Sequence, residues 1–352
     1  MSIKITGLGS FIPNLKRKNS DFLKHEFLNT DGSGFPQTNE ITIEKFKAIT
    51  GIEERRYLED NLDTSDMATV AAQKAIENAG IDPETLDYLI VAHNYGDVKH
   101  GSVQSDTVPS LATRVKHNMR IKNPKCIAYD VLFGCPGWIE AVIQAQAFMK
   151  CGMAKKCLVI GAEALSRVVD KHDRDSMIFS DGAGAAVLEV SDQEGGVLSH
   201  ESATYAYQEA HHIYFGKSNR AEDIDNTRYI KMNGRKLYES ALTHVPNAMK
   251  SCLDKSGKSI DEVKKIFIHQ ANEKMDDAIV SRFYKLHNMP IPKNIMPMSI
   301  QKLGNNSVAT VPTLLDLVIR GEIKDQELNK GDIIMMASVG AGMNINALAY
   351  QY

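Results

Sequence analysis

The chain has 352 residues, of which 43% are apolar and 24% are charged, and its formal net charge is −3. This composition is typical of a globular protein with one large core or two fused domains, and it excludes the strongly basic surface of a nucleic-acid-binding protein. No stretch approaches about 18 consecutive apolar residues and no signal peptide is visible, so neither a membrane span nor secretion is expected. The five cysteines form no CxxC pair, which predicts reduced thiols in a cytoplasmic protein and no metal site.

Short apolar runs alternate along the chain with longer stretches of helical periodicity. In chain order, strands are expected at 86–94, 125–133, 155–163, 184–190, 264–272 and 331–340. Helices are expected between several of them, for example at 66–80 and 311–321. The alternation of strands and helices predicts an α/β fold.

Two segments of the chain resemble each other. The sequences IDPETLDYLIVAHN (81–94) and IDEVKKIFIHQAN (260–272) both begin with Ile-Asp, continue as an apolar strand and end in a loop that contains His and Asn. Each is followed later by a Gly-rich apolar strand. Such self-similarity is typical of internal duplication. We therefore predict two halves, 1–190 and 191–352, with a polar insertion at 14–45 and a connection or lid at 203–228.

The first candidate for chemistry is Cys135, in the segment KCIAYDVLFGCPGWIEAVIQ, where a strand turns sharply into a helix. Gly134 permits the turn, and Pro136 suits the first helical position, where a missing N–H costs nothing. Cys135 is thus expected at the helix cap, where the helix dipole favours the thiolate. Hydrolases hold their nucleophile in a similar strand–turn–helix elbow. A small buried structural cysteine is the alternative.

Two residues far downstream are candidate partners of Cys135. His269 ends an apolar strand in IFIHQAN, and active sites of α/β sheets usually lie at strand ends. Asn305 lies in LGNNSVATVP, a loop before a helix, where the alternative is a turn or capping role. The order and setting of the three residues, more than any one of them, predict a catalytic triad of Cys135, His269 and Asn305.

These motifs resemble those of the β-ketoacyl-acyl-carrier-protein synthase III family, within the thiolase superfamily. The matching segments are ITGLGSFIP at the start, ITGIEERRY (49–57), FGCPGW, FSDGAGAAVL (179–188), MNGRKLYE (232–239), HQAN (269–272), LGNNSVATVP (303–312) and VGAGM (339–343). The resemblance covers nearly the whole chain. It implies the thiolase fold, which has five layers, α-β-α-β-α, built from two duplicated halves. It also implies a homodimer with no tightly bound cofactor.

The resemblance further implies a decarboxylative Claisen condensation. The Cys135 thiolate would take an acyl group from acyl-coenzyme A or from an acyl carrier protein (ACP). The backbone N–H groups of Cys135 and Ala341 would form the oxyanion hole. His269 and Asn305 would then donate hydrogen bonds to the thioester oxygen of malonyl-ACP as CO₂ leaves. The product would be a β-ketoacyl thioester.

The resemblance also implies binding roles at positions outside the triad. Arg167 matches an arginine on the adenine side of coenzyme A, and Lys274 matches a basic residue that faces the carrier protein. Val108 falls where a residue reaches across the dimer interface to cap the acyl pocket, and its small side chain predicts medium or longer acyl chains. Lys45 and Ile49 stand where well-studied members clamp adenine between Trp and Arg, which predicts a different coenzyme A contact or a carrier-borne donor.

Other classes of protein remain open. FGCPGW differs from the usual alanine-rich loop, and the 14–45 insertion is long, which favours a specialised relative that condenses β-ketoacyl thioesters and cyclises them, as in dialkylresorcinol or quinolone biosynthesis. A non-condensing acyltransferase would use Cys135 and His269 to acylate an alcohol or amine. A papain-like protease shares the Cys, His, Asn order but not the surrounding motifs. A non-catalytic partner subunit would be expected to lack the nucleophile.

Overall fold

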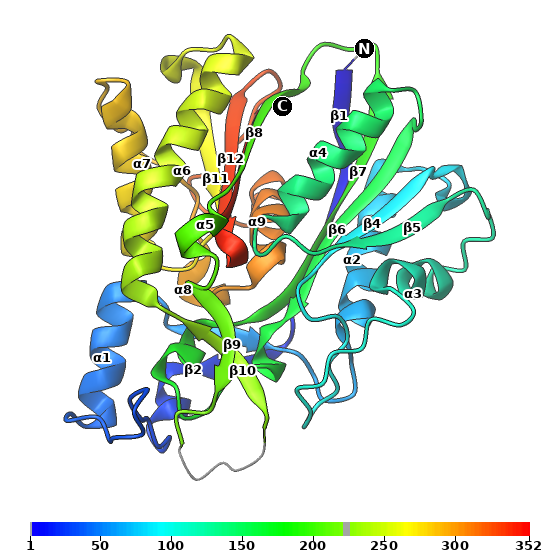
Figure 1. The fold of residues 1–352 in the computed structure, drawn as a ribbon. Helices are drawn as coiled ribbons and strands as arrows, with labels where there is room; N and C mark the ends of the chain where they lie inside the picture. The colour runs from blue at the N-terminus through cyan, green and yellow to red at the C-terminus, as the bar shows by residue number, and fades with distance from the viewer. Residues whose placement is uncertain (1, 221–225) are drawn as a thin grey trace.

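Two β-sheets form the frame of the molecule in the computed structural model, which describes residues 2–220 and 226–352 (Figure 1). The first sheet has, in spatial order, β1 (Ser2–Phe11), β7 (Asp181–Ser191), β6 (Lys156–Ala164), β4 (Tyr88–Ala92) and β5 (Ile127–Val131). The second has, in spatial order, β11 (Val263–Ile268), β12 (Ile333–Gly340), β13 (Asn344–Gln351) and β8 (Gly196–Thr204).

The two sheets share one topology over four strands. In the first, β4 is parallel to β6, and β7 is antiparallel to both β6 and β1. In the second, β11 is parallel to β12, and β13 is antiparallel to both β12 and β8. The similar segments 81–94 and 260–272 therefore supply corresponding strands, β4 and β11. The expected domain boundary after residue 190 lies at the end of β7 and stays a prediction.

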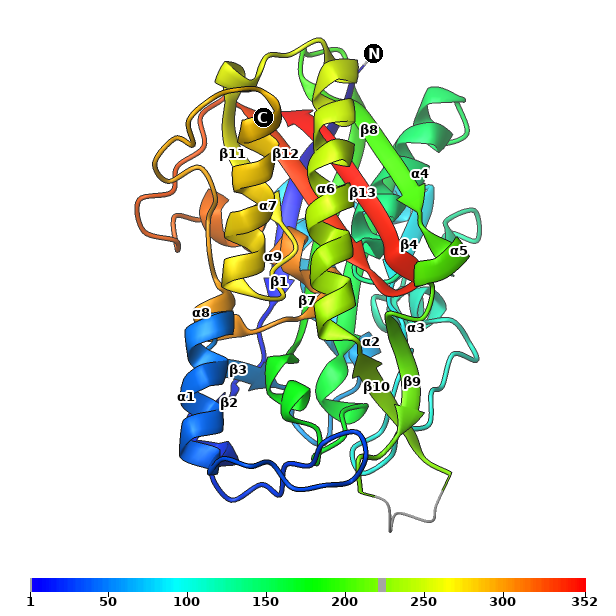
Figure 2. The same cartoon turned by 60° about the vertical axis from the view of Figure 1, so that its left-hand side comes forward.

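Helices cover both faces of each sheet and complete five layers (Figures 1 and 2). The helices α2 (Thr64–Ala79) and α3 (Leu111–Asn118) cover the first sheet, and α6 (Gly234–Ser256) and α7 (Glu273–Leu286) cover the second. Between the sheets lie α4 (Gly137–Lys150) and α9 (Thr310–Ile319). Nearly every side chain of α9 is buried because sheets pack on both sides of it, which explains its mostly apolar sequence. Its buried Asp316 accepts a hydrogen bond from the Ser10 hydroxyl in β1.

Two further units lie at one end of the sheets (Figure 2). The expected 14–45 insertion contributes β2 (Leu15–Lys18) and most of α1 (Asn39–Thr50), and it packs around a small core of its own with β3 (Glu54–Tyr57). The expected 203–228 connection begins within the last two residues of β8 and then forms α5 (Ala206–Glu209) and β9 (Ile213–Lys217), which pairs with β10 (Arg228–Met232). Residues 221–225 of that connection lie outside the described residues. The short α8 (Ile300–Leu303) leads toward α9.

Candidate active site

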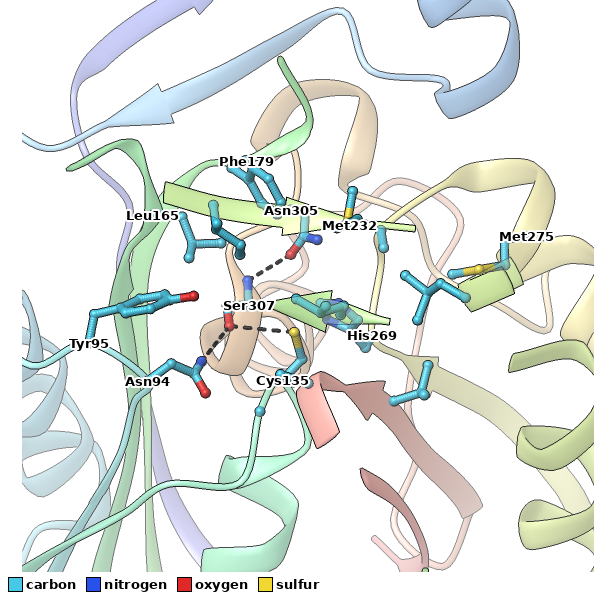
Figure 3. A pocket seen from close by; sticks show the side chains of 17 residues that line it. Asn94, Tyr95, Cys135, Leu165, Phe179, Met232, His269, Met275, Asn305 and Ser307 are labelled. Atoms are coloured by element: carbon cyan, nitrogen blue, oxygen red, sulfur yellow. Dashed lines mark hydrogen bonds between the residues drawn. The ribbon is translucent and has the colours of Figure 1, made fainter. Parts of the chain in front are cut away.

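One small cavity brings together the candidate residues that lie far apart in the sequence (Figure 3). It measures about 70 Å³, and its lining includes Cys135, His269, Asn305 and Ala341. The other lining residues are mostly apolar and include Leu165, Phe179, Ile213, Ile230, Met232 and Met275. Cys135 precedes α4 and Asn305 precedes α9. Because these two helices occupy corresponding places in the duplicated fold, the starts of both face one cavity.

Cys135 lies in the turn between β5 and α4, but the helix begins one residue later than the sequence suggested. Pro136 is the cap residue, with φ −69° and ψ −6°, and Gly137 is the first helical residue. The N–H of Gly137 donates to the carbonyl of Gly134, which closes the turn. Gly134 has φ +67°, a conformation that glycine adopts readily. The elbow predicted from Gly-Cys-Pro is therefore present, with Cys135 just before the cap.

Burial opposes the effect of the helix terminus on the Cys135 thiol. Desolvation raises the pKa of this thiol to about 11, because the thiolate loses more solvation than the neutral thiol. The hydroxyl of Ser307 donates to Cys135 Sγ over 3.5 Å and lowers the pKa in part. The favourable effect of the helix start on the thiolate, expected from the sequence, is therefore opposed by burial, and Ser307 is a second group that favours the thiolate.

His269 follows β11 directly, and its backbone N–H donates to the carbonyl of Ala337 in β12 over 2.8 Å. The side chain is buried, and desolvation lowers the pKa of the imidazole to about 4. Its Nδ1 has no hydrogen-bond partner among the described residues. A neutral imidazole carries one N–H, so at neutral pH His269 can donate a hydrogen bond but holds no positive charge.

Asn305 is held in place by its backbone and by one side-chain atom. Its N–H donates to the Ile178 carbonyl over 3.0 Å, and its carbonyl accepts from the N–H of Ser180 over 2.8 Å. Its side-chain Oδ1 accepts from the backbone N–H of Ser307 over 2.9 Å (Figure 3). Since the oxygen of the amide is engaged, the Nδ2 group is the part of Asn305 that can donate into the cavity.

Ala341 begins the short 3-10 helix η7 (Ala341–Met343). It packs against the turn that carries Gly134 and Cys135. A Cβ added at Gly340 would lie 2.3 Å from the Cys135 nitrogen, and one added at Gly134 would lie 2.7 Å from the Ala341 nitrogen. Only glycine at both positions allows this approach. The two backbone segments thus form one wall of the cavity, as an oxyanion hole built from Cys135 and Ala341 requires.

Three polar side chains near Cys135 were not expected from the sequence. Ser307, in the turn η6 (Ser307–Ala309), contacts the sulfur, and Asn94 and Tyr95 line the cavity from the loop after β4. Asn94 Nδ2 donates to Ser307 Oγ over 3.2 Å and to Glu163 Oε2 over 2.6 Å. A signal for Asn94 was present in the sequence. The loops after β4 and β11 are the His- and Asn-bearing loops of the two similar segments, and both reach the cavity.

A larger cleft of about 650 Å³ adjoins the cavity and shares Met232, Leu237, Ala271 and Met275 with it. Its other lining residues are mixed, with apolar side chains such as Phe46 and Ile49 beside polar and charged ones. The charged ones are Lys45, Arg174, Arg235, Asp175 and Glu239. Lys45 and Ile49, which stand where well-studied members of the resembled family clamp adenine between Trp and Arg, both line this cleft. Lys274 is exposed in the first turn of α7, between the lining residues Asn272 and Met275.

Two expected binding residues lie apart from this cavity and cleft. Val108 is 85% exposed and does not line the cavity of its own chain. Arg167 is buried, and its Nη2 donates to the carbonyls of Glu59 and Leu62, over 2.9 and 3.3 Å. Arg167 does not line the larger cleft, and its Nη2 is engaged by these internal carbonyls; its expected contact with the adenine side of coenzyme A stays a prediction.

Neither a metal cluster nor a membrane helix stands out in the part of the chain that the structure describes. Within residues 2–220 and 226–352, no group of three or more His, Cys, Asp or Glu side chains is arranged to hold a metal ion. Over the same residues, no helix combines the length and apolarity needed to cross a membrane.

Comparison with known proteins identifies the family. The family model for 3-oxoacyl-[acyl-carrier-protein (ACP)] synthase III matches residues 129–206, and the model for its C-terminal part matches residues 253–352. A β-ketoacyl-[acyl-carrier-protein] synthase III from Aquifex aeolicus is 32% identical over 100% of both chains. One from Halalkalibacterium halodurans is 32% identical over 99% of this chain and 98% of its own. The crystal structure of the synthase III from Aquifex aeolicus VF5 matches with a TM-score of 0.81 at 30% identity and covers 100% of both chains.

The architecture is thus the thiolase fold, with five layers and two duplicated halves, and the class of protein is a condensing acyltransferase. The chain belongs to the β-ketoacyl-acyl-carrier-protein synthase III family. The fold class and the family expected from the sequence are confirmed.

Proposed function

We propose that the chain transfers an acyl group to Cys135 and condenses it with malonyl-ACP, with loss of CO₂, to give a β-ketoacyl thioester. Cys135 is the nucleophile, and the N–H groups of Cys135 and Ala341 form the oxyanion hole. His269 and Asn305 donate hydrogen bonds to the thioester oxygen of the malonyl group and stabilise the enolate. The observation that carries the proposal is the single cavity lined by all four residues.

The state of His269 and Asn305 supports condensation over simple acyl transfer. A neutral imidazole can donate to an enolate oxygen, and burial keeps His269 neutral at pH 7 by lowering its pKa to about 4. The Asn305 amide presents its N–H group to the cavity because its oxygen accepts from Ser307. Two donors that converge on one oxygen suit enolate stabilisation, whereas acyl transfer to an alcohol or amine mainly needs a base.

The larger cleft is the proposed route for the thioester arm. It is continuous with the cavity through Met232, Leu237, Ala271 and Met275. Its walls carry Lys45 and Ile49 in place of an adenine clamp, which favours an acyl donor borne on a carrier protein. We assign Lys274, exposed beside the cleft, to the carrier-protein surface. The buried hydrogen bonds of Arg167 weaken its assignment to coenzyme A. The proposed reaction uses the acyl donor and malonyl-ACP and needs no tightly bound cofactor.

A homodimer is proposed to complete the acyl pocket. β5 is the edge strand of the first sheet, and Ile127 on it and Leu132 just after it are exposed by 47% and 65%. Asp130 in β5 accepts from the N–H groups of Leu111 and Ala112, which anchors the segment that carries Val108 beside this edge. An apolar sheet edge favours pairing with a second copy, and Val108 would then cap the acyl pocket of the partner.

The proposed location is the cytoplasm. The free cysteines fit its reducing conditions.

Intact-protein mass spectrometry tests the acylation step. The chain is incubated with acyl-coenzyme A and acyl-ACP donors of increasing chain length. We expect a mass increase of one acyl group, with medium or longer chains accepted, and no increase in Cys135→Ala. Acetyl as the only donor would contradict the assigned chain length, and the absence of any adduct would overturn the proposal.

Release of CO₂ from malonyl-ACP tests the condensation step. Because each donor to a developing oxyanion contributes roughly 10²–10³-fold, His269→Ala and Asn305→Ala should still form the acyl adduct but lose decarboxylation by about that factor. Condensation at the wild-type rate in these variants would show that the two residues have other roles.

A further inference from the structure

We propose that Ser307 is a further catalytic residue that stabilises the thiolate of Cys135, and that Asn94 and Glu163 position its hydroxyl. The inference deepens the proposed function and rests on it only in taking Cys135 as the nucleophile. The atoms involved form one chain of hydrogen bonds from Glu163 in β6 through the loop after β4 to the segment before α9. Figure 3 shows the part of this chain from Asn94 through Ser307 to Cys135.

The chemistry of Glu163 sets the direction of every bond in this chain. Glu163 is 1% exposed, and its Oε2 accepts from the backbone N–H of Asn94 over 2.8 Å and from Asn94 Nδ2 over 2.6 Å. Because Oε2 accepts from a backbone N–H, it serves as an acceptor atom here, and Asn94 turns its NH₂ group toward the same oxygen. The other N–H of that group donates to Ser307 Oγ over 3.2 Å. The Ser307 O–H is then left to donate to Cys135 Sγ, 3.5 Å away.

The backbone of Ser307 supplies a second, independent observation. Its φ is +54°, in the left-handed region where glycine is favoured and other residues are strained. A strained non-glycine residue beside a reactive atom indicates a function for its side chain. The same residue also orients the candidate enolate donor, because its N–H donates to Asn305 Oδ1 over 2.9 Å. Ser307 thus contacts both Cys135 and Asn305.

The thiolate that Ser307 stabilises arises twice in the proposed cycle. In acyl transfer, Cys135 Sγ bonds to the acyl carbon, the carrier thiol leaves, and the thiol proton of Cys135 ends on that leaving group. In condensation, the bond between the malonyl carbon and CO₂ breaks, and its electron pair forms the new carbon–carbon bond. The bond from sulfur to the acyl carbon then breaks, and Cys135 leaves as a thiolate that solvent protonates. A hydroxyl that donates to sulfur lowers the barrier of each step.

The pH dependence of Cys135 alkylation measures this role without any acyl donor. Iodoacetamide labelling of the Cys135 peptide is followed by mass spectrometry from pH 6 to 11 in the wild type and in Ser307→Gly, which removes the hydroxyl and tolerates the positive φ. A hydrogen bond to a charged group changes an equilibrium by roughly tenfold or more, so the alkylation midpoint should rise by about one pH unit. Because burial places the Cys135 midpoint near the top of this pH range, the rise is measured as a roughly tenfold lower alkylation rate at each pH below the midpoint. Ser307→Ala is the second variant should the first fail to fold.

Asn94→Leu tests the positioning residues, because leucine keeps the volume of asparagine and removes its donors. Its alkylation midpoint should rise as well, and the double variant with Ser307→Gly should rise no further than Ser307→Gly alone. Thr310→Val is the matched control, since the Thr310 hydroxyl lies in the same segment but bonds to Asn306 and the Ser307 carbonyl. An unchanged midpoint in Ser307→Gly, or additive shifts in the double variant, would overturn the inference. Failure of the proposed function would show differently, as a wild-type chain that takes no acyl group.

Discussion

Gly134 and Ala341 are in direct backbone contact, although they are far apart in the sequence. A Cβ placed on Gly134 would lie 2.7 Å from the nitrogen and 2.8 Å from the carbonyl oxygen of Ala341. The turn that carries Cys135 and the turn that follows β12 therefore share one surface with no side chain between them. The distance between the two proposed oxyanion-hole donors depends on this contact.

Gly134→Ala should damage both stability and acyl transfer. The new methyl group would clash with the Ala341 backbone, and φ +67° is unfavourable for alanine. We expect a loss of about 1–3 kcal/mol in the free energy of unfolding. A displacement of about 1 Å at the donors should slow acylation by roughly 10²-fold. Thermal unfolding and the rate of adduct formation measure the two effects.

Gly152→Ala is the matched control for that variant. Gly152 also has a positive φ, +74°, but a Cβ there would meet nothing within 4 Å. It should cost about 1 kcal/mol from backbone strain and leave acylation unchanged. Equal losses of acylation in the two variants would show that the contact with Ala341 is irrelevant.

His269 should make stability fall in mild acid. The folded-state pKa is lowered from 6.5 to about 4, so below pH 6.5 the unfolded chain binds a proton that the folded chain does not. Stability from this residue is present above pH 6.5 and is lost as the pH falls toward 4. Between pH 7 and pH 5 the loss is about 2 kcal/mol. Urea unfolding at both pH values measures this loss, and in His269→Asn the fall in unfolding free energy from pH 7 to pH 5 should be smaller by about 2 kcal/mol than in the wild type. An equal fall in the two proteins would contradict the assigned pKa shift.

Glu163 should have the opposite effect on the pH dependence of stability. Burial raises the pKa of its carboxyl from 4.5 to about 7, so between these values the folded chain binds a proton that the unfolded chain releases. Stability from this residue is present below pH 4.5 and is lost as the pH rises through 7. From pH 5 to pH 8 the loss is about 2–3 kcal/mol, and Glu163→Gln should remove it. Parallel stability curves for the wild type and the variant would contradict this prediction.

Val108→Phe should change the choice of acyl donor and leave the fold intact. The side chain is 85% exposed in the single chain, so the substitution should change stability by less than about 0.5 kcal/mol. In the proposed dimer, the larger ring would shorten the partner's acyl pocket and favour short donors. The panel of acyl thioesters measures this preference, with light scattering as a check that the variant remains dimeric. An unchanged preference in a dimeric variant would remove Val108 from the pocket.

Lys231→Met should loosen the β9–β10 hairpin that forms part of the cavity wall. The buried Lys231 ammonium donates to Asp170 at 2.6 Å, Asp173 at 2.9 Å and Asn219 at 2.8 Å. Its removal leaves two carboxylates without their cation and should cost about 3–5 kcal/mol. Acylation should slow as well, because Ile230 and Met232, its neighbours in β10, line the cavity.

Lys250→Met provides the comparison for Lys231. Lys250 forms an exposed ion pair with Asp254 one helical turn away, and such pairs contribute little. The change in unfolding free energy should stay within about 0.5 kcal/mol, and acylation should be unaffected. A similar cost for both lysines would show that the buried cluster is not what stabilises the hairpin.

Much of the fold was readable from the sequence because its signals are local. The apolar runs that became β4, β6, β7, β11 and β12 have the composition of buried strands, and the similarity of 81–94 to 260–272 corresponds to equivalent strands of the two sheets. The turn at Cys135 depends on Gly134 and Pro136, its immediate neighbours. Strand limits were less accurate. The run at 125–133 forms a strand only over Ile127–Val131, because the residues after it turn toward the helix.

The environment of the candidate site was decided by the tertiary structure. Solvation depends on what the whole chain packs around a group, so no local pattern could show that burial raises the pKa of Cys135 or that Arg167 is held by internal carbonyls. Ser307 reads locally as a loop residue before a helix. It reaches Cys135 only because α4 and α9 begin at the same point between the two sheets, and 172 positions separate the two residues in the chain. The amino-acid sequence by itself determined which residues could react, and the packing of the two halves decided their protonation, their orientation and their partners.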